Sequence, residues 1–166
     1  MEKPSVRVAI VMERVAIANR WQPYRWQLAS VLPDLDEAAP RTLVRADASL
    51  QRLYPGFEIV LHRDETEGYY LNVSAPDPRV FVMWRLQEDR AGADDEAQPL
   101  LATVSYNEAA RWMDAQEKVD SVPIPEELHA WLARHVQENY KPDVKRERIR
   151  PRSFESKEGR YKRGMG

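Results

Sequence analysis

The sequence predicts an α+β domain: a mostly antiparallel, curled sheet of about six or seven short strands, then two helices and a disordered basic tail. Three observations lead to this prediction. Apolar residues recur at every second position through most of the first 104 residues, helix-capping and period-3.6 patterns begin at Ser105, and residues 141–166 are basic and poor in apolar side chains. With 166 residues, 43% of them apolar, we expect one domain at 1–140 and a flexible tail at 141–166.

Seven segments have the spacing of strands, at residues 6–17, 26–32, 42–44, 57–61, 69–73, 80–86 and 100–104. In the first, Val6, Val8, Ile10 and Met12 follow the period of a half-buried strand, and apolar content continues far enough for a long or bent strand. The fourth and fifth are separated by a polar stretch ending at Gly68, which predicts a β-hairpin. The sixth is apolar at both odd and even positions, and therefore on both faces, which predicts a central strand.

The remaining segments are expected to be loops and helices. Residues 87–98 carry five acids and no periodic apolar residue, which predicts a solvated loop. Ser105 and Glu108 form a capping box, so we expect a helix from there to about Glu117. Its expected core face is Tyr106, Ala109, Ala110 and Met113.

A second helix is expected after a connection that contains Pro123 and Pro125. Its residues recur with helical spacing on one apolar face: Leu128, Trp131, Leu132, His135 and Val136.

The composition excludes several classes of function. Without cysteine, the chain forms no disulfide, uses no cysteine nucleophile and holds no iron–sulfur cluster by its own thiolates. Its six glycines form neither GxGxxG nor GxxxxGK[ST], so neither of these phosphate-binding loops is present. The three histidines form no HExxH motif, and we expect no metal and no cofactor. No secretory signal or membrane segment is recognisable, and we expect a cytoplasmic protein.

The segment from Trp21 to Trp26 is the most unusual local feature. It places three aromatic side chains and an arginine within six residues, between the first two expected strands. Because these residue types dominate binding hot spots, Trp21, Tyr24, Arg25 and Trp26 are candidate contacts with a partner protein. In the alternative interpretation the tryptophans fill the end of the sheet core. Both hold if Trp26 is buried while Trp21 and Tyr24 are exposed.

The tail reverses the charge of the rest of the chain. It holds ten Lys and Arg residues against four acids, whereas residues 1–140 hold 15 against 23. One cluster in this arm is a candidate contact with phosphate backbones or an acidic protein: Lys145, Arg146, Arg148, Arg150 and Arg152. The alternative is a solvated arm that keeps the protein soluble or folds back on the acidic body.

A weaker candidate site surrounds His62. His62, Asp64 and Glu65 follow an expected strand, and Arg14 or Arg63 would supply a guanidinium group for a small anion such as formate or a pterin phosphate. In the alternative interpretation these residues form a polar hairpin end.

A set of short motifs occurs between residues 6 and 140, in the order Val11-Met12-Glu13-Arg14, Trp21, Trp26, Val31-Leu32-Pro33, the run LHRDETEGY at 61–69, Leu71-Asn72, Val122-Pro123-Ile124-Pro125 and Trp131. Taken in this order, they resemble an uncharacterised bacterial family, a domain of unknown function encoded near formate dehydrogenase operons. The resemblance implies no activity and no catalytic residue. It implies an accessory role in making, delivering or regulating a molybdenum- or tungsten-dependent formate dehydrogenase.

The sequence therefore favours a non-enzymatic accessory protein that binds another protein, with a formate dehydrogenase subunit or a maturation factor as the expected partner. Two alternatives stay open: nucleic-acid binding through the basic arm, and a small-anion sensor or enzyme with a pocket near His62.

Overall fold

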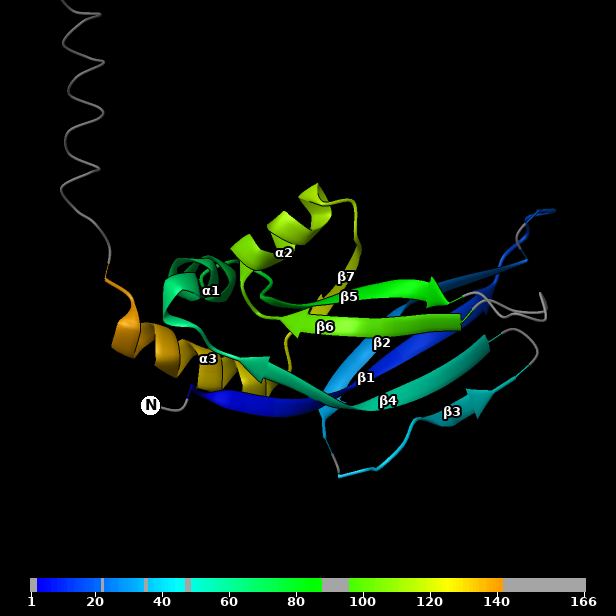
Figure 1. The fold of residues 1–166 in the computed structure, drawn as a ribbon, viewed down its shortest axis with the longest axis horizontal. Helices are drawn as coiled ribbons and strands as arrows, with labels where there is room; N and C mark the ends of the chain where they lie inside the picture. Colours follow the sequence, from blue (N-terminus) through cyan, green and yellow to red (C-terminus); the bar gives the residue numbers. More distant parts are fainter. Residues whose placement is uncertain (1–2, 22, 35, 47–48, 88–95, 142–166) are drawn as a thin grey trace, which may run out of the picture.

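The computed structural model confirms an α+β fold and divides seven antiparallel strands between two sheets (Figure 1). It describes residues 3–21, 23–34, 36–46, 49–87 and 96–141, and all structural statements concern these residues. The first sheet has the order β2-β1-β4-β3, with β1 at Ser5–Ala16, β2 at Tyr24–Pro33, β3 at Arg41–Arg45 and β4 at Ser49–Val60. The second has the order β6-β5-β7, with β5 at Arg79–Gln87, β6 at Glu96–Thr103 and β7 at Lys118–Pro123.

β1 is an inner strand of the first sheet because both of its faces are apolar. Val8, Ile10 and Met12 face the main core, as the period of two predicts, while Ala9 and Val11 are buried on the opposite face. β1 pairs antiparallel with β2 and with β4, and an irregularity interrupts each register. Such bulges bend a strand and increase its twist, which agrees with the expectation that this strand is long or bent.

β5 is the central strand of the second sheet, as the apolar residues on both of its faces predict. Val80, Val82 and Trp84 belong to the main core. Phe81 and Met83 are buried on the other face, where the ring of Phe81 meets the ring of Tyr106 edge to face at 6.2 Å.

The two sheets share one main core and contact each other between β2 and β7 and between β4 and β6, so the expected single curled sheet is in fact two sheets. Between β2 and β7, the backbone N–H of Leu28 donates to Oδ2 of Asp120 over 3.0 Å. Between β4 and β6, the Tyr54 hydroxyl lies 2.7 Å from Oε1 of Glu96 and 3.0 Å from the carbonyl of Ala97.

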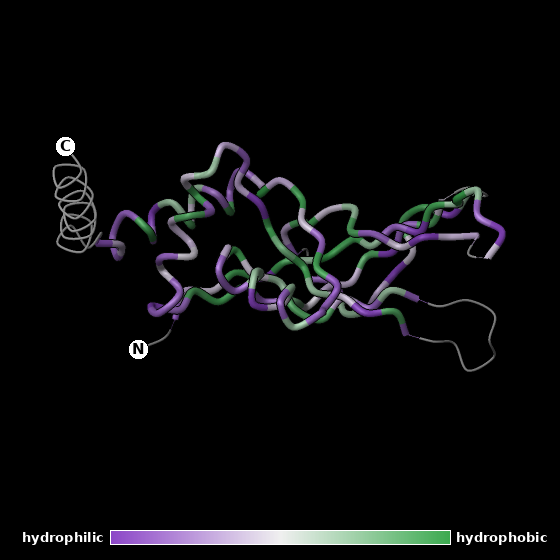
Figure 2. Tube along the Cα trace, turned by 90° about the horizontal axis from the view of Figure 1, so that it is seen from above, coloured by the Kyte–Doolittle hydropathy of each residue, from purple (hydrophilic) through white to green (hydrophobic). Residues whose placement is uncertain are grey.

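Three α-helices gather at one end of the molecule, opposite the turns that join β1 to β2 and β3 to β4 (Figure 1). The short 3-10 helix η1 (Arg63–Glu65) leads into α1 (Thr66–Val73), α2 (Tyr106–Asp114) follows β6, and α3 (Glu126–Asn139) follows β7. Figure 2 shows the same long axis from above, with hydrophobic stretches along the strands. None of the described helices is both long and apolar enough to cross a membrane.

α2 begins where its cap predicts, but its buried face differs from the prediction. The Ser105 hydroxyl accepts the N–H of Glu108 over 3.1 Å, as expected for a capping box. The helix ends at Asp114 and not near Glu117. Ala109 is buried, whereas Tyr106 and Met113 are exposed, so only one of the four residues expected on the core face is fully buried.

α3 matches its predicted apolar face. It begins directly after Pro125 and buries Leu128, Leu132, His135 and Val136, with Trp131 partly buried against the core.

Residues 69–73 form most of α1 and not the returning strand of a hairpin, so this prediction is wrong. Tyr69 and Asn72 are buried three residues apart, whereas Tyr70 and Leu71 between them are exposed, which is helical spacing. Gly68 also has a different role from the expected turn. A Cβ atom there would lie 2.2 Å from the Ser105 hydroxyl oxygen, so only glycine allows α1 to approach the start of α2 this closely.

Residues 118–123 form the strand β7, which had been expected to be a connection. β7 pairs antiparallel with β5 from Arg79↔Pro123 to Trp84↔Lys118. Because β7 is an edge strand, a proline at its last position removes no necessary ladder hydrogen bond. Helices and strands are therefore interleaved: α1 lies between β4 and β5 in the chain, and β7 between α2 and α3.

Two further expectations fall partly or wholly outside the described residues. The expected loop at 87–98 starts and ends in strands, since Gln87 closes β5 and Glu96 opens β6, and residues 88–95 are not described. Residues 142–166 are also outside, and with them the arm residues Lys145, Arg146, Arg148, Arg150 and Arg152. The division of the chain at residue 140 stays a prediction.

Candidate functional site: a pocket between two histidines and an exposed aromatic turn

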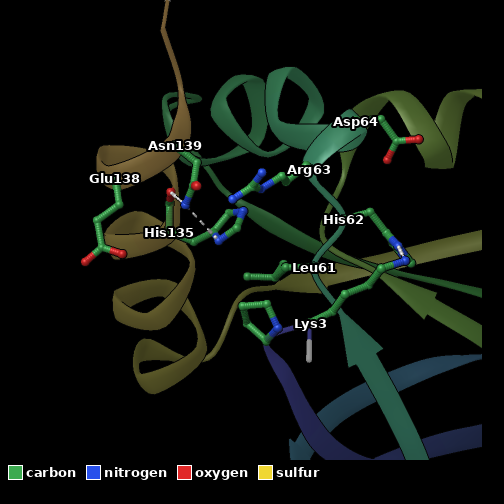
Figure 3. A pocket seen from close by; sticks show the side chains of 9 residues that line it. Lys3, Leu61, His62, Arg63, Asp64, His135, Glu138 and Asn139 are labelled. Atoms are coloured by element: carbon green, nitrogen blue, oxygen red, sulfur yellow. Dashed lines mark hydrogen bonds between the residues drawn. The ribbon is translucent and has the colours of Figure 1, made fainter. Parts of the chain in front are cut away.

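A pocket of about 620 Å³ opens at the helical end, which we define as η1, α1 and α3 (Figure 3). It lies where the start of β1, the segment after β4 and the end of α3 meet. Its lining comprises Lys3, Pro4, Leu61, His62, Arg63, Asp64, His135, Glu138 and Asn139. A volume of this size is typical of a small-molecule site. The structure therefore brings together three residues of the expected His62 site, namely His62, Arg63 and Asp64.

Two residues of that expected site lie elsewhere. Glu65 faces α2, where it accepts the Ser105 hydroxyl over 2.7 Å and pairs with Arg111. Glu65 therefore holds the start of α1 against α2 and does not line the pocket. Arg14 lies at the opposite end of the molecule, with its guanidinium carbon 4.2 Å from the centre of the Tyr24 ring. The expectation that Arg14 serves this pocket is thus wrong.

His62 is fixed from two sides. The ammonium group of Lys3 lies 3.0 Å from Nδ1 of His62. Because lysine can only donate, Nδ1 accepts, and the proton of the neutral ring is then on Nε2. The backbone N–H of His62 donates to the Tyr69 hydroxyl over 2.8 Å, which ties this segment to α1.

His135 forms the opposite wall of the pocket and is buried. One turn later on α3, the Asn139 amide donates to the His135 carbonyl over 2.8 Å and stands 3.3 Å from the ring nitrogen Nδ1. The Tyr69 ring lies edge-on, with its centroid 5.7 Å from that of the imidazole. Burial lowers the pKa of His135 below its ordinary value, which favours the neutral ring.

In that neutral ring the proton is on Nε2, because the Asn139 amide occupies Nδ1. Nε2 is buried and has no hydrogen-bond partner among the described residues. The sequence analysis placed His135 on the apolar face of this helix. Asn139, four residues later on the same face, could have indicated a polar contact for His135, but nothing in the sequence places residue 135 near residue 62. Across the described residues, no three His, Asp or Glu side chains converge as a metal-binding group.

The second candidate region is the hairpin end, defined as residues 13–21, 23–27, 43–46 and 49–52. Trp21 is 86% exposed in the turn between β1 and β2. The turn itself is held by hydrogen bonds: the Trp21 N–H donates to the Asn19 side chain over 2.8 Å, and the Ile17 N–H donates to the Pro23 carbonyl over 2.9 Å. The indole is therefore presented to solvent from an ordered backbone.

The four aromatic-cluster residues divide between surface and core. Trp26 is 8% exposed and belongs to the main core. Tyr24 is half-buried beneath Arg14, and Arg25 is exposed on β2, with its guanidinium group 3.3 Å from Gln27. The structure thus places Trp21 and Arg25 on the surface and Trp26 inside.

The hairpin end is basic. Its described residues include five arginines, Arg14, Arg20, Arg25, Arg45 and Arg52, and one acid, Glu13. The sheet register sets Arg14 opposite Trp26 on one side and Leu50 on the other, and Leu50 in turn pairs with Arg45. By contrast, η1, α1 and α3 carry six acids and two arginines.

A protein-family model matches residues 7–150 of the chain. Its description is "Protein of unknown function (DUF3305)". The chain belongs to this family. The match contains the hairpin end, every pocket-lining residue except Lys3 and Pro4, and the arm as far as Arg150, and leaves Arg152 outside. No curated protein and no solved structure matches the chain. The resemblance to a domain of unknown function is confirmed, and its association with formate dehydrogenase stays a prediction.

Proposed function

We propose that this DUF3305 protein is a non-enzymatic accessory protein that binds a partner protein through the hairpin end. The observation that supports this most is the 86% exposure of Trp21 on a hydrogen-bonded turn. Burying an exposed indole contributes a large apolar area, and a backbone that is already ordered loses little conformational entropy on binding. Tryptophan with arginine around it is the composition of an interface hot spot.

The charge of this end favours an acidic partner surface. Arg20, Arg25 and Arg45 are exposed, and Arg20 and Arg45 form no ion pair with another described residue. Opposite charges on the two surfaces would speed their encounter and fix their orientation. The basic arm after residue 141 would add contacts of the same sign.

The partner we propose is a formate dehydrogenase subunit or a factor that matures it. This choice is supported by the motif resemblance in the sequence, and the assignment of the interface to the hairpin end does not depend on it. The two parts of the proposal therefore need separate measurements.

The first measurement is direct binding of the purified full-length chain to purified formate dehydrogenase subunits and maturation factors on a biosensor surface. Trp21→Ala should weaken binding by roughly 2 kcal/mol or more, as expected for a hot-spot tryptophan. The matched control is Tyr106→Ala, because Tyr106 is also an exposed aromatic residue (54%) but lies on α2. Arg20→Glu should mainly slow association and reduce its salt dependence.

The outcomes separate the hypotheses. Binding that is lost in Trp21→Ala and kept in Tyr106→Ala supports the hairpin end. Equal loss in both variants, or no loss in either, contradicts it. Absence of binding to every formate dehydrogenase component overturns the choice of partner. If instead a chain ending at Tyr140 loses binding to nucleic acid, and that binding weakens steeply with salt, the arm is the functional element and the proposal fails.

A further inference from the structure

The pocket at the helical end contains a buried hydrogen-bond donor without an acceptor. Nε2 of His135 carries the proton of the neutral ring, since the Asn139 amide faces Nδ1, and Nε2 has no partner among the described residues. His135 is 9% exposed. Leaving such a donor unsatisfied in the protein interior costs about 1–3 kcal/mol. An oxygen atom that accepts from Nε2 would remove this cost.

A cationic side chain is directed at the same position. Figure 3 shows the Arg63 side chain extending toward the His135 ring, on the side of the nitrogen that Asn139 does not contact. Lys3 also lines the pocket, but its ammonium group lies beside His62, away from the His135 ring. The two acids of the lining, Asp64 and Glu138, point their carboxylates away from the ring. Among the charged side chains that line the pocket, Arg63 is therefore the one directed at the His135 ring.

We propose that this pocket binds a small oxyanion, a carboxylate or a phosphate, with one oxygen accepting from Nε2 of His135 and the Arg63 guanidinium group pairing with the anion. The planar fork of arginine suits either anion. Because Nε2 is covered, the anion would enter beneath the Arg63 side chain, which is exposed. This inference is independent of the proposed protein-binding function, which concerns the opposite end of the molecule.

The test is a titration of the full-length protein, labelled with 15N in its histidines, with sodium phosphate and separately with sodium acetate at neutral pH. Sodium chloride keeps the ionic strength constant. We expect saturable shifts of the His135 ring nitrogens with a dissociation constant below about 10 mM, and smaller shifts of His62. Saturation by phosphate alone or by acetate alone identifies the class of anion, and saturation by both supports the shared chemistry.

Arg63→Gln should weaken binding by roughly tenfold or more, the effect of losing a charge-assisted hydrogen bond. The matched control is Arg134→Gln: Arg134 is also an exposed arginine at the helical end, but it does not line the pocket. Neither change removes a buried side chain, so both variants should fold.

A second pair of variants tests the donor itself. His135→Gln keeps an N–H donor near the position of Nε2 and should retain part of the affinity, whereas His135→Leu removes the donor and should abolish saturable binding. Shifts that stay linear in anion concentration and match those in chloride overturn the proposal. Equal weakening in Arg63→Gln and Arg134→Gln also overturns it, since that result indicates non-specific charge attraction.

Discussion

The hairpin end and the helical end of this protein differ in how their functional side chains are supported. At the hairpin end, Trp21 extends into solvent from the turn between β1 and β2, and the neighbouring Arg20 has no ionic partner among the described residues. At the helical end, buried groups hold the backbone: the Tyr69 hydroxyl accepts the His62 N–H, and Asn72 on the same helix bonds to the backbone of Arg79 and Val104. The difference teaches that a change in these buried supports acts on the fold, whereas a change in an exposed side chain, Trp21 at the hairpin end or Arg63 at the pocket, is expected to act on recognition.

The largest effect is expected from Leu132→Ala in α3. Leu132 is fully buried in the main core beneath the pocket, so its truncation loses apolar transfer energy and leaves a cavity. We expect a loss of about 2–5 kcal/mol in the free energy of unfolding, measured by urea denaturation. Trp21→Ala is the comparison at the hairpin end and should change stability by less than about 0.5 kcal/mol. Similar losses in the two variants would contradict this difference in support between the two ends.

Asn72→Ala should have the next largest effect, because this buried side chain satisfies three backbone groups. Its amide donates to the carbonyls of Arg79 (2.8 Å) and Val104 (2.9 Å), and its oxygen accepts the Arg79 N–H (2.9 Å). Removing it leaves all three unpaired in the interior, with an expected loss of roughly 2–4 kcal/mol. Replacement of Asn19, which bonds a single exposed N–H at the hairpin end, is the matched control. A loss below about 1 kcal/mol in Asn72→Ala, the value of one ordinary hydrogen bond, would show that water replaces these contacts.

A third prediction concerns the contribution of Tyr69 to stability at alkaline pH. Burial raises the pKa of Tyr69 to about 12, and the phenol of the unfolded chain titrates near 10. The folded state therefore keeps a proton that the unfolded state loses, so this contribution is complete below pH 10 and disappears as the pH rises from about 10 to 12. It amounts to roughly 2–3 kcal/mol.

The corresponding measurement compares urea denaturation of the native chain and of Tyr69→Phe across this pH range. The variant lacks the titrating phenol and also leaves the His62 N–H without its acceptor, so it starts less stable. The difference between the two proteins should shrink as the pH rises. A difference that stays constant would mean that the Tyr69 phenol titrates normally. Burial also raises the pKa of Tyr54, so the variant keeps part of the alkaline slope.

The strands were predictable where the apolar pattern is long. β1 and β5 have nine or more residues; the period of two identifies β1, and apolar residues at both odd and even positions identify β5 as a central strand. α1 was not predictable in this way. It has eight residues, and its location depends on the contact between Gly68 and Ser105, which are 37 positions apart in the chain. β7 is a short edge strand with charged residues and a proline, a composition that also fits a loop.

The candidate sites show the same dependence on distance along the chain. The exposure of Trp21 and the burial of Trp26 follow from local alternation, and this was one of the two interpretations that the sequence left open. The pocket unites Lys3, His62 and His135, which only the tertiary fold brings together. Arg14 was named for this pocket as an alternative to Arg63 because a guanidinium group suits a small anion, and the register of β1 places it at the opposite end.

The smallest effect on stability is expected from a change in the turn that carries Trp21. In Asn19→Ala the Trp21 N–H loses its acceptor, but this group is exposed and water replaces the bond. Global stability should therefore change by less than about 0.5 kcal/mol. Local order should decrease, seen as a lower 15N relaxation order parameter at Trp21 with no change at Tyr69. If the turn stays rigid in this variant, the Ile17–Pro23 hydrogen bond is sufficient to order it. If order is lost and partner binding weakens with it, the recognition role of Trp21 depends on a preformed turn and not on the indole alone.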